Sequence, residues 1–597
     1  MPDLRAVLDR WSREAATLHW EQPFESVYEP DGVAGRWFVG GRLNAAVNCL
    51  DRHLPSRGDR VALYWEGEPG DRRSLTYAEL LAEVEAAAAA FLSLGVRPGD
   101  RVALYLSWLP ETVVAMLACA RIGAVHVLNS SALPASALAT RLAEVRPRLL
   151  ITQDGAWRHG VVIPLKARAD EALAAATPAT VEHTVVLRRT GIDLDWYEGD
   201  RWYHELVVSD PDTGGAAPIA VQSDHPLLVA YVANRRGRAT GLLHRTAGFM
   251  VAAAALHRCA FAYDADDDVW CACEVAWVVG QAQGIYGPLA CGASAVMFEG
   301  MLDTPHHGRA WEVIERYGVA SLLTTPVVMR RLREWTDAPP TPEHMKPLRV
   351  ILTAGEPVDP PTRAWMAREA AGRIVVGEIW GQTELGGAVT AIPSPQGPGA
   401  LPDPGFDVVD DDGRALPPGG RGELVLRYPW PGAYLAVCGA DGDEPARWTT
   451  PYATSDWAIH DEQGRVAFLG RRDELVNVSG QLVSLNEVAE VLTEHPYVSA
   501  VEVVRGINDD GTVAIVACIV VAPDATADDG LAQDLRSYVK EELGGLARLG
   551  AVVFAESFPA DMSPAHRRQA LELLCGYASR APQTLTAAQI RAAVRDS

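Results

Sequence analysis

Short apolar segments alternate with helical stretches from about residue 60 to about residue 470, and this alternation constrains the fold more than any other feature of the chain. The segment RVALYL at residues 101–106 is the clearest of them. Further apolar segments lie at residues 149–152, 184–187, 293–298 and 349–353. Buried parallel strands have continuous apolar sequences, and each parallel connection needs a crossover, usually a helix. The pattern therefore predicts parallel, layered α/β structure.

Local signals place element boundaries within this pattern. Thr76 and Glu79 form a capping box, so we expect a helix that runs from there towards Gly95. The longest apolar run, residues 113–128, is interrupted by Arg121 and is too short to span a bilayer comfortably. We therefore expect a buried helix that leads into a strand.

The character of the sequence changes after about residue 405. Acidic turn residues at 410–413 and a Pro/Gly segment at 417–420 separate short strands, which indicates a small β subdomain. The segment GRRDELVNVSG at residues 470–480 ends this β region, and we expect a separate α+β unit to follow it. Because 597 residues exceed one compact core, the predicted fold class is α/β, with a large N-terminal domain of layered α/β subdomains plus a small β subdomain, and a small α+β C-terminal domain.

The charge and the cysteine content exclude several classes of protein. The net charge is −24, so we expect no nucleic-acid partner and no membrane surface, although a local group of Arg and Lys side chains can still bind a phosphorylated ligand. The nine cysteines include no CxxC pair, which indicates a reducing compartment, and we interpret Cys271 and Cys273 as packing residues. The charged N-terminal segment has no apolar stretch typical of a signal peptide, so we expect a cytoplasmic protein.

Generic catalytic motifs are absent, but several longer segments resemble one family. The sequence contains no GxxxxGK[ST], HExxH or GxSxG motif. Five segments occur in a fixed order along the chain: WFVGGRLNAAVNCLDRHL (37–54), ETVVAMLACARIGAVH (111–126), YGPLACGASAVMFEG (286–300), TAGEP (353–357) and WGQTELGG (380–387). Together with GRRDELVNVSG they resemble the acetyl-CoA and propionyl-CoA synthetases of the adenylate-forming superfamily.

The resemblance implies a two-domain ligase that uses ATP/AMP, CoA and Mg²⁺. Residues 1–472 would form the AMP-binding domain, and residues 473–597 a small mobile domain that turns about a hinge at Asp473. Members of this superfamily first join a small carboxylate to ATP, which releases pyrophosphate and leaves an acyl-adenylate. CoA then attacks this mixed anhydride, which is a good electrophile.

The resemblance implies that the residues that bind the base and the ribose of the nucleotide are retained. Asp456 matches a carboxylate that binds both ribose hydroxyls, and a carboxylate suits a vicinal diol because it accepts two hydrogen bonds. Thr383 and Glu384 match a phosphate-contacting threonine and a glutamate associated with Mg²⁺. The other implied nucleotide contacts are Gly355, Glu356, Pro357, Trp380, Gln382 and Arg471. The alternative is that these residues are kept only for packing and folding.

The phosphate loop, by contrast, is changed. The family loop Tyr-Thr-Ser-Gly-Ser-Thr-Gly-Lys-Pro-Lys-Gly reads YVANRRGRATG here, at residues 231–241. Glycines and hydroxyls suit such a loop because backbone N–H groups and side-chain donors then surround the phosphates. The three arginines Arg235, Arg236 and Arg238 either clamp a phosphate in their place or form a solvated basic loop.

Two cations of the family are also missing from the C-terminal domain. Ala565 stands in place of the catalytic lysine, and Leu482 stands in place of an arginine that contacts the phosphate. His566, Arg567 and Arg568 are the candidates to substitute for the lysine if the register shifts. Losing one preorganised cation costs about 10²–10³ in rate. The resemblance therefore implies that acid activation by ATP is weakened or lost.

The residues implied for CoA are partly retained. Arg158, Gly480 and Lys540 match contacts to CoA. Val161 replaces a second arginine, however, and Ser131-Ala132 replaces a pair of glycines near the CoA nucleotide. The resemblance therefore implies at most weak CoA binding.

The implied acyl pocket consists of Trp277, Val278, Val279, Ala354 and Gly381. Gly381 stands where acetyl-CoA synthetases place a tryptophan that caps the pocket, and Ala354 replaces a valine. Val279 replaces a threonine, so the lining is more apolar. We therefore expect an acyl or aryl group larger than acetyl. The alternative is that an unused pocket has drifted in sequence or is filled by a neighbouring side chain.

Three functions stay open on the sequence. The first is a divergent enzyme that handles an activated acyl group, as an acyl-adenylate or an acyl thioester. The second is a non-catalytic protein that binds a nucleotide or a CoA ester, or that serves a partner enzyme or carrier protein. The third is an ordinary ATP-dependent carboxylic acid–CoA ligase with unusual phosphate ligands.

Overall fold

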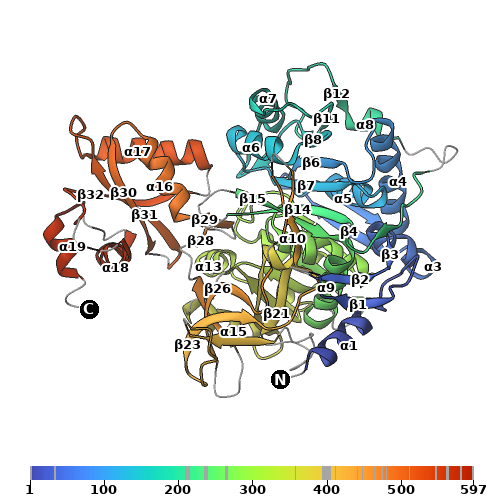
Figure 1. Cartoon of the computed structure of the whole chain (residues 1–597). Helices are drawn as coiled ribbons and strands as arrows, with labels where there is room; N and C mark the ends of the chain where they lie inside the picture. Colours follow the sequence, from blue (N-terminus) through green and yellow to red (C-terminus); the bar gives the residue numbers. More distant parts are fainter. Residues whose placement is uncertain are drawn as a thin grey trace.

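The chain folds into a large N-terminal domain and a small C-terminal domain in a computed structural model (Figure 1). The structure describes all residues except 1–2, 32–34, 209–214, 234–238, 262–265, 356–357, 359, 393–404, 411, 440–441, 447, 461–465, 472–474, 479–480, 510, 545–546, 560–561, 563, 579–580, 582 and 594–597. The mixed α/β architecture confirms the predicted fold class. The domain boundary at Asp473 stays a prediction, because that residue lies outside the described ones.

A nine-stranded sheet forms the first α/β layer, in the order β12-β11-β8-β6-β7-β14-β15-β24-β25. The strands are β12 (Asp200–Trp202), β11 (His183–Leu187), β8 (Leu149–Gln153), β6 (Arg101–Leu106), β7 (Val125–Ser130), β14 (Pro226–Ala233), β15 (Ala239–Arg245), β24 (Tyr434–Val437) and β25 (Glu444–Pro445). From β12 to β14 all pairs are parallel, so these six strands end at one edge of the sheet. The strands predicted at 101–106, 149–152 and 184–187 are β6, β8 and β11.

An eight-stranded sheet forms the second layer, in the order β21-β20-β19-β18-β16-β17-β4-β5. The strands are β21 (Gly387–Ile392), β20 (Val375–Gln382), β19 (Val350–Ala354), β18 (Val319–Thr324), β16 (Asp268–Cys271), β17 (Ser294–Phe298), β4 (Val61–Glu66) and β5 (Arg72–Thr76). The inner strands are parallel, and only the edge strands β21 and β5 pair antiparallel. The strands predicted at 293–298 and 349–353 are β17 and β19.

A smaller antiparallel sheet follows in the chain and confirms the predicted β subdomain. Its strands are β22 (Phe406–Val409), β23 (Arg421–Leu426), β26 (Tyr452–His460) and β27 (Val466–Arg471), in this order. The subdomain therefore extends from about residue 405 to the start of the GRRDELVNVSG segment, as predicted.

Two helices lie where their sequence signals place them. Helix α4 (Tyr77–Ser93) starts at the capping box, since Thr76 Oγ1 accepts from Glu79 N–H and the Glu79 carboxylate accepts from Thr76 N–H. Helix α5 (Pro110–Arg121) is almost wholly buried and leads into β7, as the apolar run predicts. Other helices that cover the two sheets are α1 (Leu4–Ala15), α6 (Ala135–Val145), α7 (Leu165–Ala175), α9 (Thr246–Ala260), α12 (Arg309–Arg316), α13 (Pro326–Glu334) and α15 (Pro360–Ala370). None of the helices in the described part of the chain has the length and apolarity needed to cross a bilayer.

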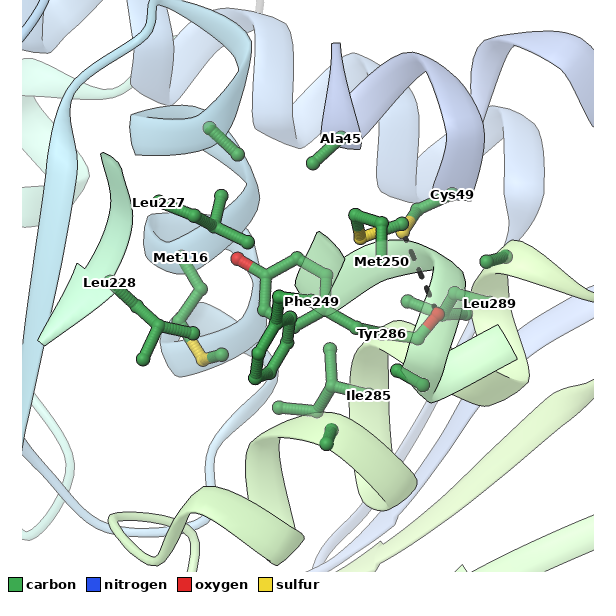
Figure 2. Packing of buried hydrophobic residues seen from close by; sticks show 14 of the residues in the cluster. Ala45, Cys49, Met116, Leu227, Leu228, Phe249, Met250, Ile285, Tyr286 and Leu289 are labelled. Carbon is green, nitrogen blue, oxygen red and sulfur yellow. Dashed lines mark hydrogen bonds between the residues drawn. The ribbon is translucent and has the colours of Figure 1, made fainter. Parts of the chain in front are cut away.

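Tyr286 lies at the centre of the main core, between the two layers. Figure 2 shows its ring among Phe249, Met116 and Ile285, and it meets the Phe249 ring edge-on at a centroid distance of 5.6 Å. Cys271 and Cys273 are buried in the same core, which agrees with their interpretation as packing residues.

Removing the hydroxyl of Tyr286 is expected to destabilise this core. Burial lowers the pKa of His126 to about 3, so its imidazole is neutral, and a hydrogen bond of 2.8 Å joins its Nε2 to the Tyr286 hydroxyl. Tyr286→Phe leaves this buried ring nitrogen without its hydrogen-bond partner, which costs about 1–3 kcal/mol. Thermal unfolding should show a lower Tm for this variant. Tyr197→Phe, at a side chain that is 55% exposed, should leave the Tm unchanged, and equal shifts in both variants would contradict this prediction.

The C-terminal domain has its own sheet and its own apolar cores. Strands β30 (Val498–Ile507), β31 (Val513–Val521), β32 (Leu549–Ala555) and β33 (Thr584–Leu585) form the sheet, and β28 (Leu475–Val478) and β29 (Gln481–Ser484) form a hairpin. Helices α16 (Leu485–Glu494) and α17 (Asp529–Leu543) pack on one side of the sheet, and α18 (Pro564–Cys575) and α19 (Ala587–Ala593) on the other. A separate core in each domain is what two folding units require.

The two domains meet along α6 and β14. Strand β29 contacts β14, and α17 contacts α6. The Glu487 carboxylate on α16 lies close enough to Arg141 on α6 to oppose the lowering of the Arg141 pKa by burial. The C-terminal domain is thus docked beside the strand that leads into residues 234–238 (Figure 1).

Candidate active site

A hydrogen-bonded group joins the end of β20 to β26 and brings together three residues predicted for the nucleotide. The Asp456 carboxylate oxygen Oδ2 accepts from Trp380 Nε1 at 2.8 Å and from Gln382 Nε2 at 3.1 Å. Gln382 Nε2 also donates to the Thr454 carbonyl at 2.7 Å. The three predicted side chains are only 6–8% exposed, so the geometry of the carboxylate is fixed by buried donors.

A local distortion of β26 directs Asp456 towards β20. Ser455 has a φ of 59°, the left-handed region that a non-glycine residue rarely adopts. The pairing of β23 with β26 shifts register at this point, between Glu423 and Val425. The Ser455 N–H donates to the Glu423 carboxylate at 3.2 Å, which helps to hold the distortion. Strained backbone of this kind persists where the surrounding structure over-determines it, often beside a functional group.

Aromatic rings surround this group. The Trp380 indole stacks on Phe468 with a centroid distance of 5.2 Å and an interplanar angle of 9°, and it meets Phe406 edge-on. On the other side, Tyr452 donates from its hydroxyl to Gln382 Oε1 at 3.0 Å and stacks on Trp448. An aromatic wall beside a fixed carboxylate can hold a flat base and hydrogen-bond a sugar.

The 3₁₀ turn Thr383–Leu385 continues from β20 and carries the residues predicted for phosphate and Mg²⁺. Thr383 is buried, and Glu384 is partly exposed. Gly355 follows β19 and is exposed, with a φ of 103° that favours glycine. Glu356 and Pro357, its predicted partners at the adenine, lie outside the described residues, as does the Arg471 side chain.

The residues predicted for the acyl pocket come from three elements. Val278 and Val279 begin helix α10 (Val278–Gln281), directly after Trp277, and both are buried in the main core. Ala354 ends β19 and is also buried. A Cβ built on Gly387 would lie 3.3 Å from Ala282 Cβ and 4.0 Å from the Val278 carbonyl, so β21 runs beside α10. The structure therefore places α10 beside the β20–β21 pair that contains Gly381.

Gly381 allows β21 to approach β20 closely. A Cβ at this position would lie 2.1 Å from the Gly387 carbonyl oxygen and 2.4 Å from Ala388 Cα, at a β-bulge in the pairing. The strands as paired here have no room for any side chain at residue 381. A capping tryptophan at this position is thus incompatible with this local backbone.

Substitution of Gly381 by alanine should consequently destabilise the N-terminal domain. Because the clash is with backbone atoms and not with a flexible side chain, the strands must separate, and overpacking of this kind costs about 1–3 kcal/mol. Calorimetry should show a lower Tm for Gly381→Ala. Gly308→Ala is the matched control, since a Cβ there meets no atom closer than 3.3 Å and the Gly308 φ is −79°. An unchanged Tm for Gly381→Ala would contradict the observed pairing.

Arg158, one of the residues predicted for CoA, interacts electrostatically with the carboxyl group of Glu274, which sequence reasoning missed. Arg158 ends β9 (Ala156–Arg158), which forms a hairpin with β10 (Val161–Ile163). Burial raises the pKa of Glu274, while its contacts with Ala276 N–H and Arg158 oppose the rise. Glu274 lies three residues before Trp277 of the acyl pocket, and a single acidic residue in the apolar stretch CACEVAWVV was the only signal for it.

The other residues predicted for CoA lie in both domains. The hairpin tip after Arg158 is tied to Glu68, whose carboxylate accepts from His159 N–H and Gly160 N–H at 3.1 and 2.7 Å. Val161, in place of a second arginine, is 61% exposed. Lys540 is exposed on α17, and Gly480 lies outside the described residues.

Only the flanks of the changed phosphate loop are described. The Gly241 N–H donates to the Glu144 carboxylate at 3.2 Å, and the Arg141 guanidinium lies 4.1 Å from the centroid of the Tyr231 ring. The loop arginines lie outside the described residues, as do Asp473 and the side chains of Leu482, Ala565 and His566. Arg567 is already paired with Glu502 on β30 and lies over the Phe558 ring.

Comparison with known proteins gives the family. The sequence model of the AMP-binding enzyme family matches residues 50–432. This chain is a member of the AMP-binding enzyme family. The acetyl-coenzyme A synthetase N-terminus matches residues 10–49, and the AMP-binding enzyme C-terminal domain matches residues 487–563.

Curated relatives of this AMP-binding enzyme are similar over nearly the whole chain. An acetyl-coenzyme A synthetase of Streptomyces coelicolor is 38% identical over 93% of this chain and 87% of the relative. Those of Streptomyces avermitilis and Mycobacterium tuberculosis are each 39% identical, over 93% and 90% of this chain and 87% and 86% of the relatives. The resemblance to acetyl-CoA synthetases of the adenylate-forming superfamily is therefore confirmed, and ATP, CoA and Mg²⁺ are the cofactors of this family.

Proposed function

We propose that this acyl-CoA synthetase-like protein is an enzyme that transfers an activated acyl group larger than acetyl, with the ATP-dependent adenylation step weakened or lost. The observation that carries the proposal is the buried Asp456–Trp380–Gln382 group, which supports a working ribose and base site. The replacements in the phosphate loop and at residues 482 and 565 support the loss of adenylation.

The proposed nucleotide site assigns a role to each residue. The Asp456 carboxylate accepts hydrogen bonds from the two ribose hydroxyls. Trp380 and Gln382 are positioning residues that hold this carboxylate. Gly355, Glu356 and Pro357 line the adenine, and Arg471 reaches the ribose. Thr383 donates to a phosphate.

Glu384 would hold Mg²⁺ together with phosphate oxygens. Within the described part of the chain no group of three or more His, Cys, Asp and Glu side chains can hold a metal alone. Mg²⁺ is usually coordinated by one or two protein carboxylates, and phosphate oxygens and water molecules complete its coordination shell. When bound, the metal neutralises phosphate charge.

Acyl transfer from the adenylate needs none of the missing cations. The acceptor sulfur forms a bond to the acyl carbon, the mixed-anhydride C–O bond breaks, and AMP leaves with the bonding electrons, while the thiol proton passes to solvent. Arg158, Gly480 and Lys540 are proposed to bind the CoA acceptor, and Asp473 to be the hinge between the two domains at 472–473. Trp277, Val278, Val279, Ala354 and Gly381 are proposed to line the acyl site. Ala354 is small and stands in place of the valine of the family, which supports an acyl group larger than acetyl, whereas the space at Gly381 is filled by the backbone of β21.

Two assays separate this proposal from its rivals. We expect turnover of a synthetic acyl-adenylate with at least four acyl carbons plus CoA, while ATP–pyrophosphate exchange with the matching acid stays at least about 10²-fold slower. Rapid exchange would instead support an ordinary carboxylic acid–CoA ligase. No turnover of the adenylate with CoA, with a carrier-protein thiol or with an amine would support a non-catalytic binding protein.

A further inference from the structure

A separate cleft of about 460 Å³ opens after strands β11 and β12. Its lining includes Arg188, which directly follows β11, and Trp202, the last residue of β12. Both strands run parallel to β14, so the cleft lies at the same edge of the sheet as the end of β14. Four strand spacings of about 4.8 Å separate β11 from β14, about 19 Å in all. The cleft is therefore distant from the end of β14, and none of its lining residues is among those predicted for the nucleotide, CoA or the acyl group.

Two stacked indoles form one wall of the cleft. The Trp196 and Trp202 rings stack with a centroid distance of 4.5 Å and an interplanar angle of 29°. The Arg188 guanidinium carbon lies 4.5 Å from the centroid of the Trp202 ring. Trp196 is nevertheless 43% exposed, although burying an indole is favourable. A further planar group can therefore be covered by this ring, with Ile192 and Leu194 as apolar neighbours in the lining.

The backbone beneath the cleft is fixed in advance. The Asp154 carboxylate accepts from the N–H groups of Arg189, Thr190 and Gly191 at 2.8, 2.9 and 2.6 Å. The Arg189 side chain is tied to Asp71 and Glu299. Because this loop is held by one buried carboxylate, little ordering remains for a ligand to impose, and preorganisation of this kind favours binding.

The two charges of the cleft are available to a ligand. Arg188 is exposed and forms no ion pair with any residue that the structure describes, in contrast to its neighbour Arg189. Asp193 is exposed at the rim and likewise has no ionic partner among the described residues. A guanidinium recognises a phosphate or carboxylate, whereas a carboxylate accepts hydrogen bonds from amino or hydroxyl groups.

We propose that this cleft is a second ligand site, which binds a planar nitrogen heterocycle that carries an anionic group, the chemistry of a purine nucleoside monophosphate. The heterocycle stacks on Trp196, Arg188 binds the anion, and Asp193 accepts from amino or hydroxyl groups. The volume of the cleft lies within the range of about 300–1,000 Å³ that is usual for small-molecule sites.

The protein's own tryptophans test this proposal and the proposed function independently. The full-length protein is labelled with 5-fluorotryptophan, and the ¹⁹F resonances of three of its 17 tryptophans are assigned with Trp196→Phe, Trp202→Phe and Trp380→Phe. AMP is then titrated into the protein. Adenosine and inorganic phosphate, the two parts of AMP, are titrated separately. Trp196 and Trp202 report the cleft, and Trp380 reports the candidate active site.

We expect AMP to shift the Trp196 and Trp202 resonances saturably, more tightly than adenosine and far more tightly than phosphate. Arg188→Gln should weaken this binding at least about tenfold, as loss of a charge-assisted hydrogen bond does. Arg201→Gln is the matched control, because Arg201 is exposed on β12 and, among the residues that the structure describes, donates to the carbonyl of Asp200 alone. Unshifted Trp196 and Trp202 resonances, equal affinity for adenosine, or equal affinity in Arg188→Gln would overturn the second site. An unshifted Trp380 resonance would contradict only the nucleotide site of the proposed function.

Discussion

Asp456→Ala is expected to remove the stabilisation of this enzyme by millimolar ATP and Mg²⁺ against thermal unfolding. A site filled to 100 times its dissociation constant stabilises the native state by about 2.7 kcal/mol. In the proposed nucleotide site Asp456 supplies the carboxylate for the ribose, and no other described residue of the Trp380–Gln382 group carries a negative charge. The measurement is the shift in Tm between unliganded and liganded protein, for the wild type and for the variant.

The same substitution should also lower the Tm without ligand. The buried indole N–H of Trp380 and the amide of Gln382 lose an acceptor, at about 1–3 kcal/mol for each unsatisfied group. Asp407→Ala controls for this loss, because Asp407 is a buried carboxylate of the same β subdomain that pairs with Arg427. The control should be destabilised but keep its ligand-induced shift. A full ligand-induced shift in Asp456→Ala would mean that the ribose assignment is wrong.

The second large effect is a gain of function. Ala565→Lys restores the cation that the resemblance places at the start of α18, and we expect ATP–pyrophosphate exchange to rise by about 10²–10³ with an acid of at least four carbons. Arg567 offers no substitute in this arrangement of the domains, since its guanidinium is held by Glu502. Leu573→Lys adds the same charge at an exposed position of the same helix and should leave the rate unchanged. An unchanged rate in Ala565→Lys would contradict the alignment of residue 565 with the family lysine.

Local and periodic features of the fold could be predicted from the sequence. The capping box at Thr76, the buried helix before β7 and the apolar strand β6 depend on residues close together in the chain, so the sequence carries the whole signal. The extent of the small β subdomain, from about residue 405 to the segment at 470–480, could also be predicted, because turn residues mark its start and GRRDELVNVSG marks its end.

Features that depend on long-range pairing could not be predicted. The Asp456–Trp380 hydrogen bond joins residues 76 positions apart. It depends on a bulge at Ser455, and a serine gives no sequence signal for a positive φ. The contact of β21 with Gly381 depends on the register of two strands. The cleft at Arg188 forms in a segment without periodic pattern, between two strands, and its stacked indoles come together only after β12 has paired with β11.

The docking of the C-terminal domain beside β14 has a thermodynamic consequence. Strand β14 contacts β29, so the position of the small domain and the free energy of binding a ligand beside β14 are linked quantities. Linkage is reciprocal: a ligand that favours one position of the domain by a given factor binds that position more tightly by the same factor. Charge reversal at Glu487 on α16 should therefore change ligand affinity by altering its attraction to Arg141 on α6.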